Sequence, residues 1–264
     1  MPGSDPHHIQ KAMIRIVLNP KYEHLREAIA QLIHPFRFAR SGEVLHDGRN
    51  TIKRFDVDGT SLAVKRYGHI SPLNKIIYGT LRRSKAERAY LYAARLCNLG
   101  IDTPEEVAFV EERRYGILRA SYFISLYSDY CPVMELIEEK ASDADAQMCL
   151  FDQLANFIYH IHWAGILHRD LNIGNILCAE RETGKFSFQL IDTNRMEFRK
   201  NLSMQMRMYN LRRLSCPLTI YLSILESYAL IIRAERDSLQ LKGVWYRLLF
   251  ENRKRFKSRL RTLL

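Results

Sequence analysis

Three polar residues in the second half of the chain have the types and spacing that phosphoryl transfer needs. Within residues 165–180, His-Arg-Asp at 168–170 is followed by Asn175, five residues after the aspartate. An aspartate in this setting can accept or orient a hydroxyl proton, and the asparagine can bind a magnesium ion. Asp192 follows Asn175 by seventeen residues, at the end of an apolar run. We therefore expect Asp170 to be catalytic, and Asn175 and Asp192 to hold Mg²⁺ beside a nucleotide.

The nucleotide phosphates need fixed positive charge, and Lys65 is the candidate to supply it. It ends Ala63-Val64-Lys65 on the third expected strand, similar to the Val-Ala-Ile-Lys strand of kinases, although an ordinary exposed strand lysine would look the same. Glu87 is the single acid among eight bases between Lys65 and Arg95. It can pair with Lys65 or complete a capping box with Ser84. We favour the ion pair, because Ser84 alone can cap the helix.

A loop that covers the phosphates is less clearly marked. Only Gly42 and Gly48 stand in residues 41–51, and no GxGxxG is present. Backbone amides around Gly48 and Arg49 can cover phosphates, with help from the Arg49 side chain. A plain hairpin turn explains the same residues equally well.

The first half of the chain is rich in expected strands. Strands are predicted at 44–45, 51–57 and 61–67, with Asp58-Gly59 as a hairpin turn. A helix over 85–99 ends at Gly100, with Pro104 just beyond. Strands 107–110 and 116–126 form a second predicted hairpin around 111–114. Residues 9–34 are expected to be an amphipathic, partly irregular segment.

Near residue 127 the pattern changes from strands to helices. Ser142 and Asp145 predict a capping box for a helix that ends at Gly165. The helix buries one stripe of side chains, Phe151, Leu154, Ile158 and Ile161. Residues 176–179 and 185–191 predict a hairpin around Thr183-Gly184, and helices follow residue 201. His168 is expected to be packed, and His160 and His162 to be structural or capping residues.

We therefore expect an α+β, bilobal fold with a cleft between its lobes. Residues 1–126 comprise the N-terminal segment and a nucleotide-binding N-lobe, an antiparallel sheet with one main helix. Residues 127–264 form a compact helical C-lobe with the catalytic loop and a basic tail. With 264 residues, 47% of them hydrophobic, the chain can bury a large core.

The charge is unevenly distributed along the chain. The net charge is +11, and residues 195–264 carry all of the excess, with 16 basic and 5 acidic residues. Such blocks suggest an anionic partner, whether phosphorylated glycan, nucleic acid or membrane surface, or are simply solvated helix faces. No nucleic acid is expected, because no aromatic-basic reading motif accompanies the charge.

Cysteine usage and hydropathy exclude several classes of protein. Five scattered cysteines without a CxxC pair argue against zinc and disulfides, and fit a reducing cytoplasm. Residues 1–8 lack a signal-peptide pattern. The most apolar C-terminal stretch, 218–232, contains Glu226 and is too short to span a bilayer. We expect a soluble or peripheral protein.

Two motifs resemble a known family. His-Arg-Asp-Leu-Asn-Ile-Gly-Asn-Ile-Leu at 168–177 and Leu-Ile-Asp-Thr-Asn-Arg-Met at 190–196 are similar to the bacterial lipopolysaccharide kinase family, and the resemblance covers about residues 40–215. Asn172 stands where protein kinases usually have lysine, and Asp192-Thr193-Asn194 replaces Asp-Phe-Gly. No Ala-Pro-Glu is present. These departures favour a substrate other than protein.

The resemblance implies a protein-kinase-like fold and an ATP- and Mg²⁺-dependent transfer of the γ-phosphoryl group to a hydroxyl of Kdo or heptose in the inner core. Asp170 would orient that hydroxyl, and Lys65, braced by Glu87, would hold the α- and β-phosphates. The partner would be an anionic glycolipid, lipid A–core. The protein would be cytoplasmic, with peripheral contact to the cytoplasmic face of the inner membrane through basic residues 253–261. Phe256, Leu260 and Leu263-Leu264 suggest an interfacial helix there.

Other readings of the same residues stay open. One is a soluble small-molecule kinase, similar to aminoglycoside or choline kinases, or an atypical protein kinase. Another is a non-catalytic kinase-like binding module, which the full set of expected catalytic residues disfavours.

Overall fold

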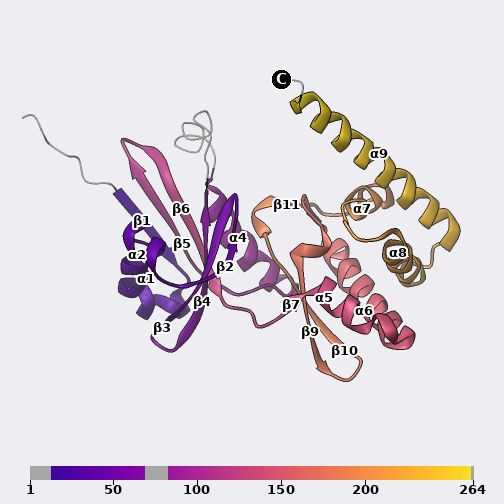
Figure 1. Cartoon of the computed structure of the whole chain (residues 1–264), viewed down its shortest axis with the longest axis horizontal. Helices are drawn as coiled ribbons and strands as arrows, with labels where there is room; N and C mark the ends of the chain where they lie inside the picture. Colours follow the sequence, from indigo (N-terminus) through magenta and orange to yellow (C-terminus); the bar gives the residue numbers. More distant parts are fainter. Residues whose placement is uncertain (1–12, 69–82, 263–264) are drawn as a thin grey trace, which may run out of the picture. The chain divides into compact units, whose positions relative to one another are not determined.

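A computed structural model describes residues 13–68 and 83–262, apart from the side chains of residues 35–37, 257 and 260–262. Leu263 and Leu264, expected in an interfacial helix, lie outside the described residues, and so does the side chain of Leu260. The chain forms two compact units (Figure 1), which are described one at a time. Unit 1 is Met1–Ala94 with Pro104–Ser128, and unit 2 is Arg95–Thr103 with Asp129–Leu264.

Unit 1 is built on an antiparallel sheet in the strand order β1-β5-β6-β4-β3-β2. The strands are β1 (Met13–Leu18), β2 (Glu43–Asp47), β3 (Asn50–Val57), β4 (Thr60–Tyr67), β5 (Glu106–Arg114) and β6 (Ile117–Leu126). The predicted hairpin between β3 and β4 is confirmed. Its turn residues Asp58 and Gly59 both have positive φ, 48° and 76°, which suits a two-residue hairpin turn.

Alternating side chains give this sheet two covered faces. Leu62 and Val64 of β4 belong to the core made with η1 (Pro20–Leu25), α1 (Arg26–Leu32) and α2 (Pro35–Arg40). On the other face, Tyr67 and Phe109 pack with Ala86 and Ala89 of α4 (Lys85–Asn98). Because neighbouring residues of a strand point to opposite faces, Lys65 falls on the α4 face.

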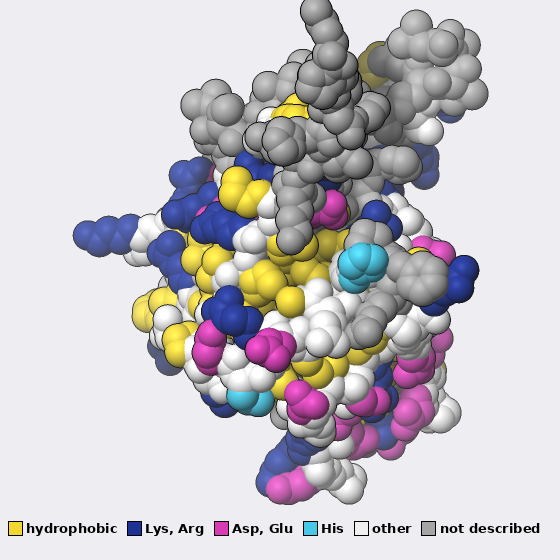
Figure 2. All heavy atoms as spheres, turned by 90° about the vertical axis from the view of Figure 1, so that its left-hand side faces the viewer, with side chains coloured by type: hydrophobic (Ala, Val, Ile, Leu, Met, Phe, Trp, Pro, Cys, Tyr) yellow, Lys and Arg dark blue, Asp and Glu magenta, His cyan; other side chains and the backbone are white. Residues whose placement is uncertain are grey.

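Figure 2 shows the side of unit 1 that carries β1 and α1, where hydrophobic side chains gather among Lys and Arg side chains. Met13 and Ile14 of β1 are exposed and line a shallow pocket with Arg15, Arg26 and Ala30.

Two expectations for unit 1 were wrong in detail. Residues 9–34 were expected to be partly irregular, but Met13–Leu18 forms strand β1, paired with β5 from Met13↔Arg113 to Leu18↔Ala108. The hairpin between β5 and β6 turns at Tyr115-Gly116, both with positive φ, rather than around 111–114. Residues 111–114 continue β5 because Glu111 and Glu112 pair with Ser121 and Ala120.

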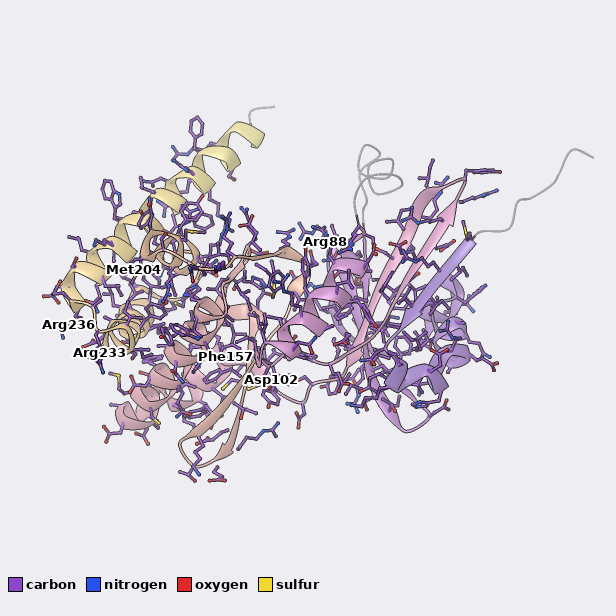
Figure 3. All side chains as sticks on the ribbon, turned by 180° about the vertical axis from the view of Figure 1, so that it is seen from behind. Arg88, Asp102, Phe157, Met204, Arg233 and Arg236 are labelled. Carbon is purple, nitrogen blue, oxygen red and sulfur yellow. The ribbon has the colours of Figure 1, made fainter. Side chains whose placement is uncertain are left out.

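Unit 2 combines helices with three short antiparallel strand pairs. Its helices are α5 (Val133–Glu139), α6 (Ala144–Trp163), α7 (Met204–Leu211), α8 (Leu218–Ile232) and α9 (Arg236–Thr262). Helix α6 packs against α8, α9 packs against both α7 and α8, and α5 packs on strand β9. The predicted hairpin is formed by β9 (Ile176–Glu182) and β10 (Lys185–Leu190), with β7 (Cys131–Pro132) added to β9. The strands β8 (Ile166–His168) and β11 (Met196–Phe198) form a separate pair. Figure 3 labels Phe157 on α6, Met204 at the start of α7, and Arg233 and Arg236 at the turn between α8 and α9.

The buried stripe of α6 is confirmed, but its predicted cap is wrong. Phe151, Leu154, Ile158 and Ile161 are all buried. The N-cap is Asp143, whose carboxylate accepts from the Ala146 N–H at 3.0 Å, because Ser142 belongs to the preceding turn η2 (Lys140–Ser142). None of the described helices is long and apolar enough to cross a membrane.

Candidate active site

The loop after β8 begins at a buried histidine. His168 Nδ1 accepts a hydrogen bond from the Asp170 N–H at 3.1 Å, so the ring proton lies on Nε2, which donates to the Ile191 carbonyl at 3.2 Å. Burial lowers the pKa of His168 despite the nearby Asp192 carboxylate, which raises it. As predicted, His168 is packed, and it shapes the loop as a neutral ring.

Asp170 is held at both its backbone and its side chain. Arg195 Nη1 donates to Asp170 Oδ2 at 3.3 Å, and the Asp170 carbonyl accepts from Asn175 Nδ2 at 2.9 Å. One-third of the side chain remains exposed. A carboxylate fixed in this way and open to solvent can receive a hydroxyl proton.

Asn175 and Asp192 are brought together by the β9–β10 hairpin. Asn175 ends the turn η3 (Ile173–Asn175) just before β9, and Asp192 follows β10 by two residues. The Ile191 N–H donates to the Asn175 carbonyl at 2.9 Å, which closes this end of the hairpin. The two predicted metal ligands therefore stand on neighbouring segments.

Asp192 has an unusual backbone conformation. Its φ and ψ are 58° and 43°, the left-handed region that few residues other than glycine adopt. Asn194, which is buried, donates from Nδ2 to Asp192 Oδ1 at 2.6 Å. A strained residue held by a buried partner is typical of functional positions.

The donor set fits a magnesium ion shared with phosphate. Asn175 uses its amide nitrogen on Asp170, so its side-chain oxygen is the atom left for a cation. A carboxamide and a carboxylate oxygen are hard ligands of the kind Mg²⁺ prefers. The described part of the chain has no cluster of three or more His, Cys, Asp or Glu side chains suited to a metal. Phosphate oxygens and water would therefore complete the coordination.

Lys65, the candidate for the phosphate-binding lysine, belongs to the antiparallel sheet of unit 1. It lies in the middle of β4, opposite Ile52 of β3 and Phe123 of β6. Its ammonium group lies 5.6 Å from the centre of the Tyr67 ring. A strand flanked by two neighbours gives this charge a rigid base.

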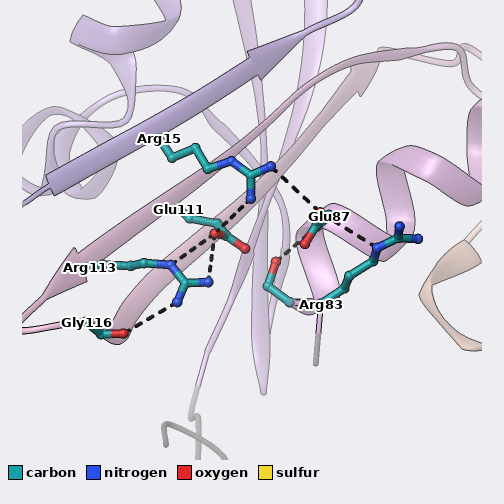
Figure 4. A network of polar contacts seen from close by, with 7 residues as sticks. Arg15, Arg83, Glu87, Glu111, Arg113 and Gly116 are labelled. Carbon is teal, nitrogen blue, oxygen red and sulfur yellow. Dashed lines mark hydrogen bonds and ion pairs between the residues drawn. The ribbon is translucent and has the colours of Figure 1, made fainter. Parts of the chain in front are cut away.

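Glu87 is engaged by two arginines (Figure 4). Its carboxylate lies 3.8 Å from Arg15 Nη2 of β1 and 3.9 Å from Arg83 Nε. Ser84 caps α4 by accepting from the Glu87 N–H at 3.0 Å. Both of these charged partners are arginines, and in the sheet β5 and β6 lie between β4, which carries Lys65, and β1, which carries Arg15. The unpredicted strand β1 supplies the competing Arg15.

Gly48 and Arg49 form the tip of the hairpin between β2 and β3. The Arg49 backbone carbonyl packs closely against Gly68, where an added Cβ would lie 2.2 Å from that oxygen. The tip is therefore fixed against the end of β4, within unit 1. The contacts fit both the phosphate-covering loop and the plain turn.

No motif pointed to Arg15, Arg195 or Asn194. Arg15 connects β1 with α4, Arg195 connects the segment after Asp192 with the catalytic loop, and Asn194 belongs to a buried turn. These contacts do not follow from helical or strand periodicity. Arg195 offered one signal, since it is the first base after Asp192.

Comparisons with known proteins agree with this arrangement. No curated protein matches the chain in sequence. A solved structure described as "WaaP in complex with acyl carrier protein" is similar, with a TM-score of 0.60 and 20% sequence identity, over 92% of this chain and 98% of that chain. At this identity the likeness shows the fold, a mixture of antiparallel sheet and helices as in kinases. The model of the lipopolysaccharide kinase (Kdo/WaaP) family matches residues 49–235. The chain belongs to this family of kinases, phosphotransferases that act on sugar hydroxyls.

Proposed function

We propose that this protein transfers the γ-phosphoryl group of ATP to a hydroxyl of Kdo or heptose in the inner core of lipopolysaccharide. The observation that carries the proposal is the Ile191–Asn175 hydrogen bond of 2.9 Å, since it puts Asn175 beside the segment of Asp192. The Asn175 amide at the same time holds the backbone of Asp170. With the family membership, this arrangement supports phosphoryl transfer at Asp170.

In this proposal the chain's residues orient the reactants and neutralise charge. Asp170 accepts the proton of the acceptor hydroxyl, while Arg195 keeps the carboxylate in place. Asn175 and Asp192 hold Mg²⁺, which when bound neutralises charge on the β- and γ-phosphates. Catalysis is then largely a matter of position and electrostatics.

The nucleotide is assigned to unit 1. Lys65 holds the α- and β-phosphates, and the backbone around Gly48 and Arg49 covers them. Glu87 serves as the brace of Lys65 once its carboxylate exchanges Arg15 or Arg83 for the lysine ammonium group. Residues 1–126 then serve as the nucleotide-binding lobe, and residues 127–264 as the catalytic lobe. The central position of Lys65 on β4 supports its role. We expect Lys65→Met to raise the KM for ATP. Lys53 is buried on the opposite face of the same sheet, so Lys53→Met should lower stability instead.

The acceptor glycolipid places the enzyme on the cytoplasmic face of the inner membrane. Helix α9 supports this location, because its apolar side chains Leu241, Trp245, Leu248 and Phe256 are exposed. Between Arg253 and Arg261 the chain has six basic residues and no acid. Within unit 2, Figure 1 shows the end of α9 extending past α7 and α8. Each base near an anionic surface contributes about 1 kcal/mol.

Liposome sedimentation tests this contact. Replacing Arg253, Lys254 and Arg255 with glutamine should weaken binding to anionic vesicles at least about tenfold at low salt. Lys185→Gln, an exposed lysine on the β9–β10 hairpin, serves as the control. Unchanged binding of the triple variant would contradict the contact.

The acyl carrier protein in the similar WaaP structure suggests a further partner of the same class for this chain. Co-purification of a tagged protein, followed by mass spectrometry, tests that suggestion. A chain that is stable and monomeric without any acyl carrier protein would contradict it.

Mass spectrometry of lipid A–core glycans tests the proposed function. Cells with the gene, without it, and complemented by wild type, Asp170→Asn or the control Asp152→Asn should be compared, since Asp152 is an exposed acid on α6. A phosphate restored by wild type and Asp152→Asn alone supports the proposal, and fragmentation assigns it to Kdo or heptose. Purified Asp170→Asn should lose about 10²- to 10⁴-fold in kcat. Identical glycans in all cells would reject the proposal.

A further inference from the structure

The end of α7 and the residues that follow it are bonded to the catalytic loop at two points. Asn210 Nδ2 donates to the His168 carbonyl at 2.7 Å, and Ser215 Oγ donates to Asn172 Oδ1 at 3.5 Å. Residues 210–215 therefore run alongside residues 168–172 of the catalytic loop. Arg213 lies in this segment and Asp170 in the loop, and their charges are near enough to interact.

Arg213 has an apolar support and a cationic neighbour. Its guanidinium carbon lies 5.0 Å from the centre of the Phe250 ring, and that of Arg212 lies at the same distance. Arg212 is buried and also stacks on Tyr209 at 3.2 Å, and its Nε has no hydrogen-bond partner among the described residues. Phe250 of α9 thus holds two guanidinium groups beside each other.

Among the described residues, the positive charges near Asp170 outnumber the carboxylates that pair with them. Asp170 pairs with Arg195, and Arg169 pairs with Glu197. None of the ion pairs found among the described residues includes Arg212 or Arg213. Burial and the Arg212 charge lower the pKa of Arg213, while the nearby Asp170 carboxylate raises it. Arg213 is thus a half-buried cation near a carboxylate that Arg195 already pairs with, and a further anion can bind to it.

We propose that Arg213 binds an anionic group of the acceptor, a carboxylate or a phosphate monoester, next to the hydroxyl that Asp170 receives. The inference rests on the proposed function, because it assigns Asp170 to the acceptor. A guanidinium can bind either oxyanion through two parallel hydrogen bonds, which fixes the orientation of the sugar as well as its affinity. Arg195 stays on Asp170, and Arg212 adds charge from behind. Arg213 thereby selects acidic sugars over neutral ones.

Steady-state kinetics on three acceptors tests the selection. These are the lipid A–core glycolipid from cells without the gene, the same glycolipid after removal of its phosphates, and the same glycolipid after reduction of its carboxyl groups. On the intact acceptor, Arg213→Met should raise the acceptor KM about 10- to 100-fold, with the KM for ATP unchanged. Arg213→Lys should recover part of the loss. Arg236→Met, which removes an exposed charge paired with Glu226 and Asp237, is the matched control.

The modified acceptors identify the group that Arg213 contacts. Wild type and Arg213→Met should have equal acceptor KM values on whichever acceptor lacks that group, and differ on the other. A wild-type advantage of the same size on all three acceptors would overturn the inference, and so would a change confined to the KM for ATP.

A binding measurement separates this inference from the proposed function. The deacylated core oligosaccharide, with its phosphate and carboxylate groups, should bind wild type about 10- to 100-fold more tightly than Arg213→Met in calorimetry without nucleotide. If wild type transfers no phosphate to any glycolipid, the proposed function fails. The calorimetric affinity for the oligosaccharide still tests the role of Arg213. Equal affinity for the two proteins, or no binding to wild type, would overturn it.

Discussion

Asn210 donates a hydrogen bond of 2.7 Å to the backbone carbonyl of His168, and both residues are buried. The other end of the Asn210 amide accepts from His162 Nε2 at 3.2 Å, which leaves His162 Nδ1 to accept from the Tyr228 hydroxyl at 2.8 Å. Helices α6, α7 and α8 thus each contribute one side chain to a buried polar chain. Its end is the carbonyl that begins the catalytic loop.

Replacing Asn210 with leucine should destabilise the protein by about 2–4 kcal/mol. The change leaves the His162 ring nitrogen buried without its Asn210 acceptor, which costs about 1–3 kcal/mol, and removes one of the two hydrogen bonds to the His168 carbonyl, which costs about 0.5–1.5 kcal/mol. The other bond to that carbonyl, from the Leu171 N–H at 3.1 Å, remains. Urea unfolding of wild type, Asn210→Leu and the exposed control Asn201→Ala measures the difference. If Asn210→Leu unfolds at the same urea concentration as the control, the buried chain does not stabilise the loop.

Acidification should weaken the fold through His162. Burial lowers the pKa of His162 from an ordinary 6.5 to about 4. Between these values the unfolded chain binds more protons than the folded one, so the free energy of unfolding decreases as pH falls from about 6.5 to about 4, by about 3 kcal/mol from this residue. Below pH 4 the loss from His162 is complete. His168 adds to the loss in the same direction.

The comparison of His162→Gln with wild type isolates this effect. Urea unfolding between pH 4 and 7 should give a clearly smaller pH dependence for the variant. His160→Gln removes an exposed histidine of the same helix and should keep the wild-type dependence. Parallel curves for His162→Gln and wild type would show that another group is responsible.

Local patterns were enough to predict much of the fold. The β3–β4 hairpin follows from two alternating runs around Asp58-Gly59, and the buried stripe of α6 follows from helical spacing. In both cases the residues that decide the structure are near one another in sequence. Strand β1 was missed because the residues it pairs with on β5, from Met13↔Arg113 to Leu18↔Ala108, are far away in the sequence, and a short apolar run alone does not distinguish strand from helix.

The candidate site divides in the same way. Asp170, Asn175 and Asp192 were found because their spacing around one hairpin is itself the signal. The contacts of Arg195 with Asp170 and of Asn194 with Asp192 depend on how the turn after β10 folds back. Glu87 shows the limit most clearly, since the arginine that contacts it from the sheet, Arg15, comes from the unpredicted strand.

The correction of the α6 cap leads to a paired prediction. Asp143→Ala should cost about 1 kcal/mol of stability, because it removes the acceptor for the Ala146 N–H and a negative charge at the helix start. Ser142→Ala should change stability by only a few tenths of a kcal/mol, since Ser142 makes no described cap contact. Thermal unfolding of the two variants checks the assignment. A larger loss for Ser142→Ala would restore the original capping box.

Gly165 should be far less replaceable than Gly184, although both have a φ near +74°. An added Cβ at Gly165 would lie 1.9 Å from the Arg199 carbonyl oxygen, whereas at Gly184 the nearest atom is 4.0 Å away. Gly184→Ala should cost about 1–2 kcal/mol from backbone strain. Gly165→Ala should cost several kcal/mol more, because the Arg199–Gly165 hydrogen bond of 2.8 Å must also shift. Equal melting temperatures for the two variants would contradict the close approach.

The hydrogen bond from Asn194 to Asp192 yields a prediction about the proposed metal ligand. Without the Asn194 amide, the Asp192 carboxylate loses a donor that helps to orient it while its backbone is left-handed. Loss of a group that orients a metal ligand typically weakens metal binding about 10- to 100-fold. Asn194→Ala should therefore raise the Mg²⁺ concentration for half-maximal activity by that factor, and saturating Mg²⁺ should restore most of kcat. Asn201→Ala is the control. A lower kcat at an unchanged Mg²⁺ requirement would mean that Asn194 stabilises the turn without orienting the ligand.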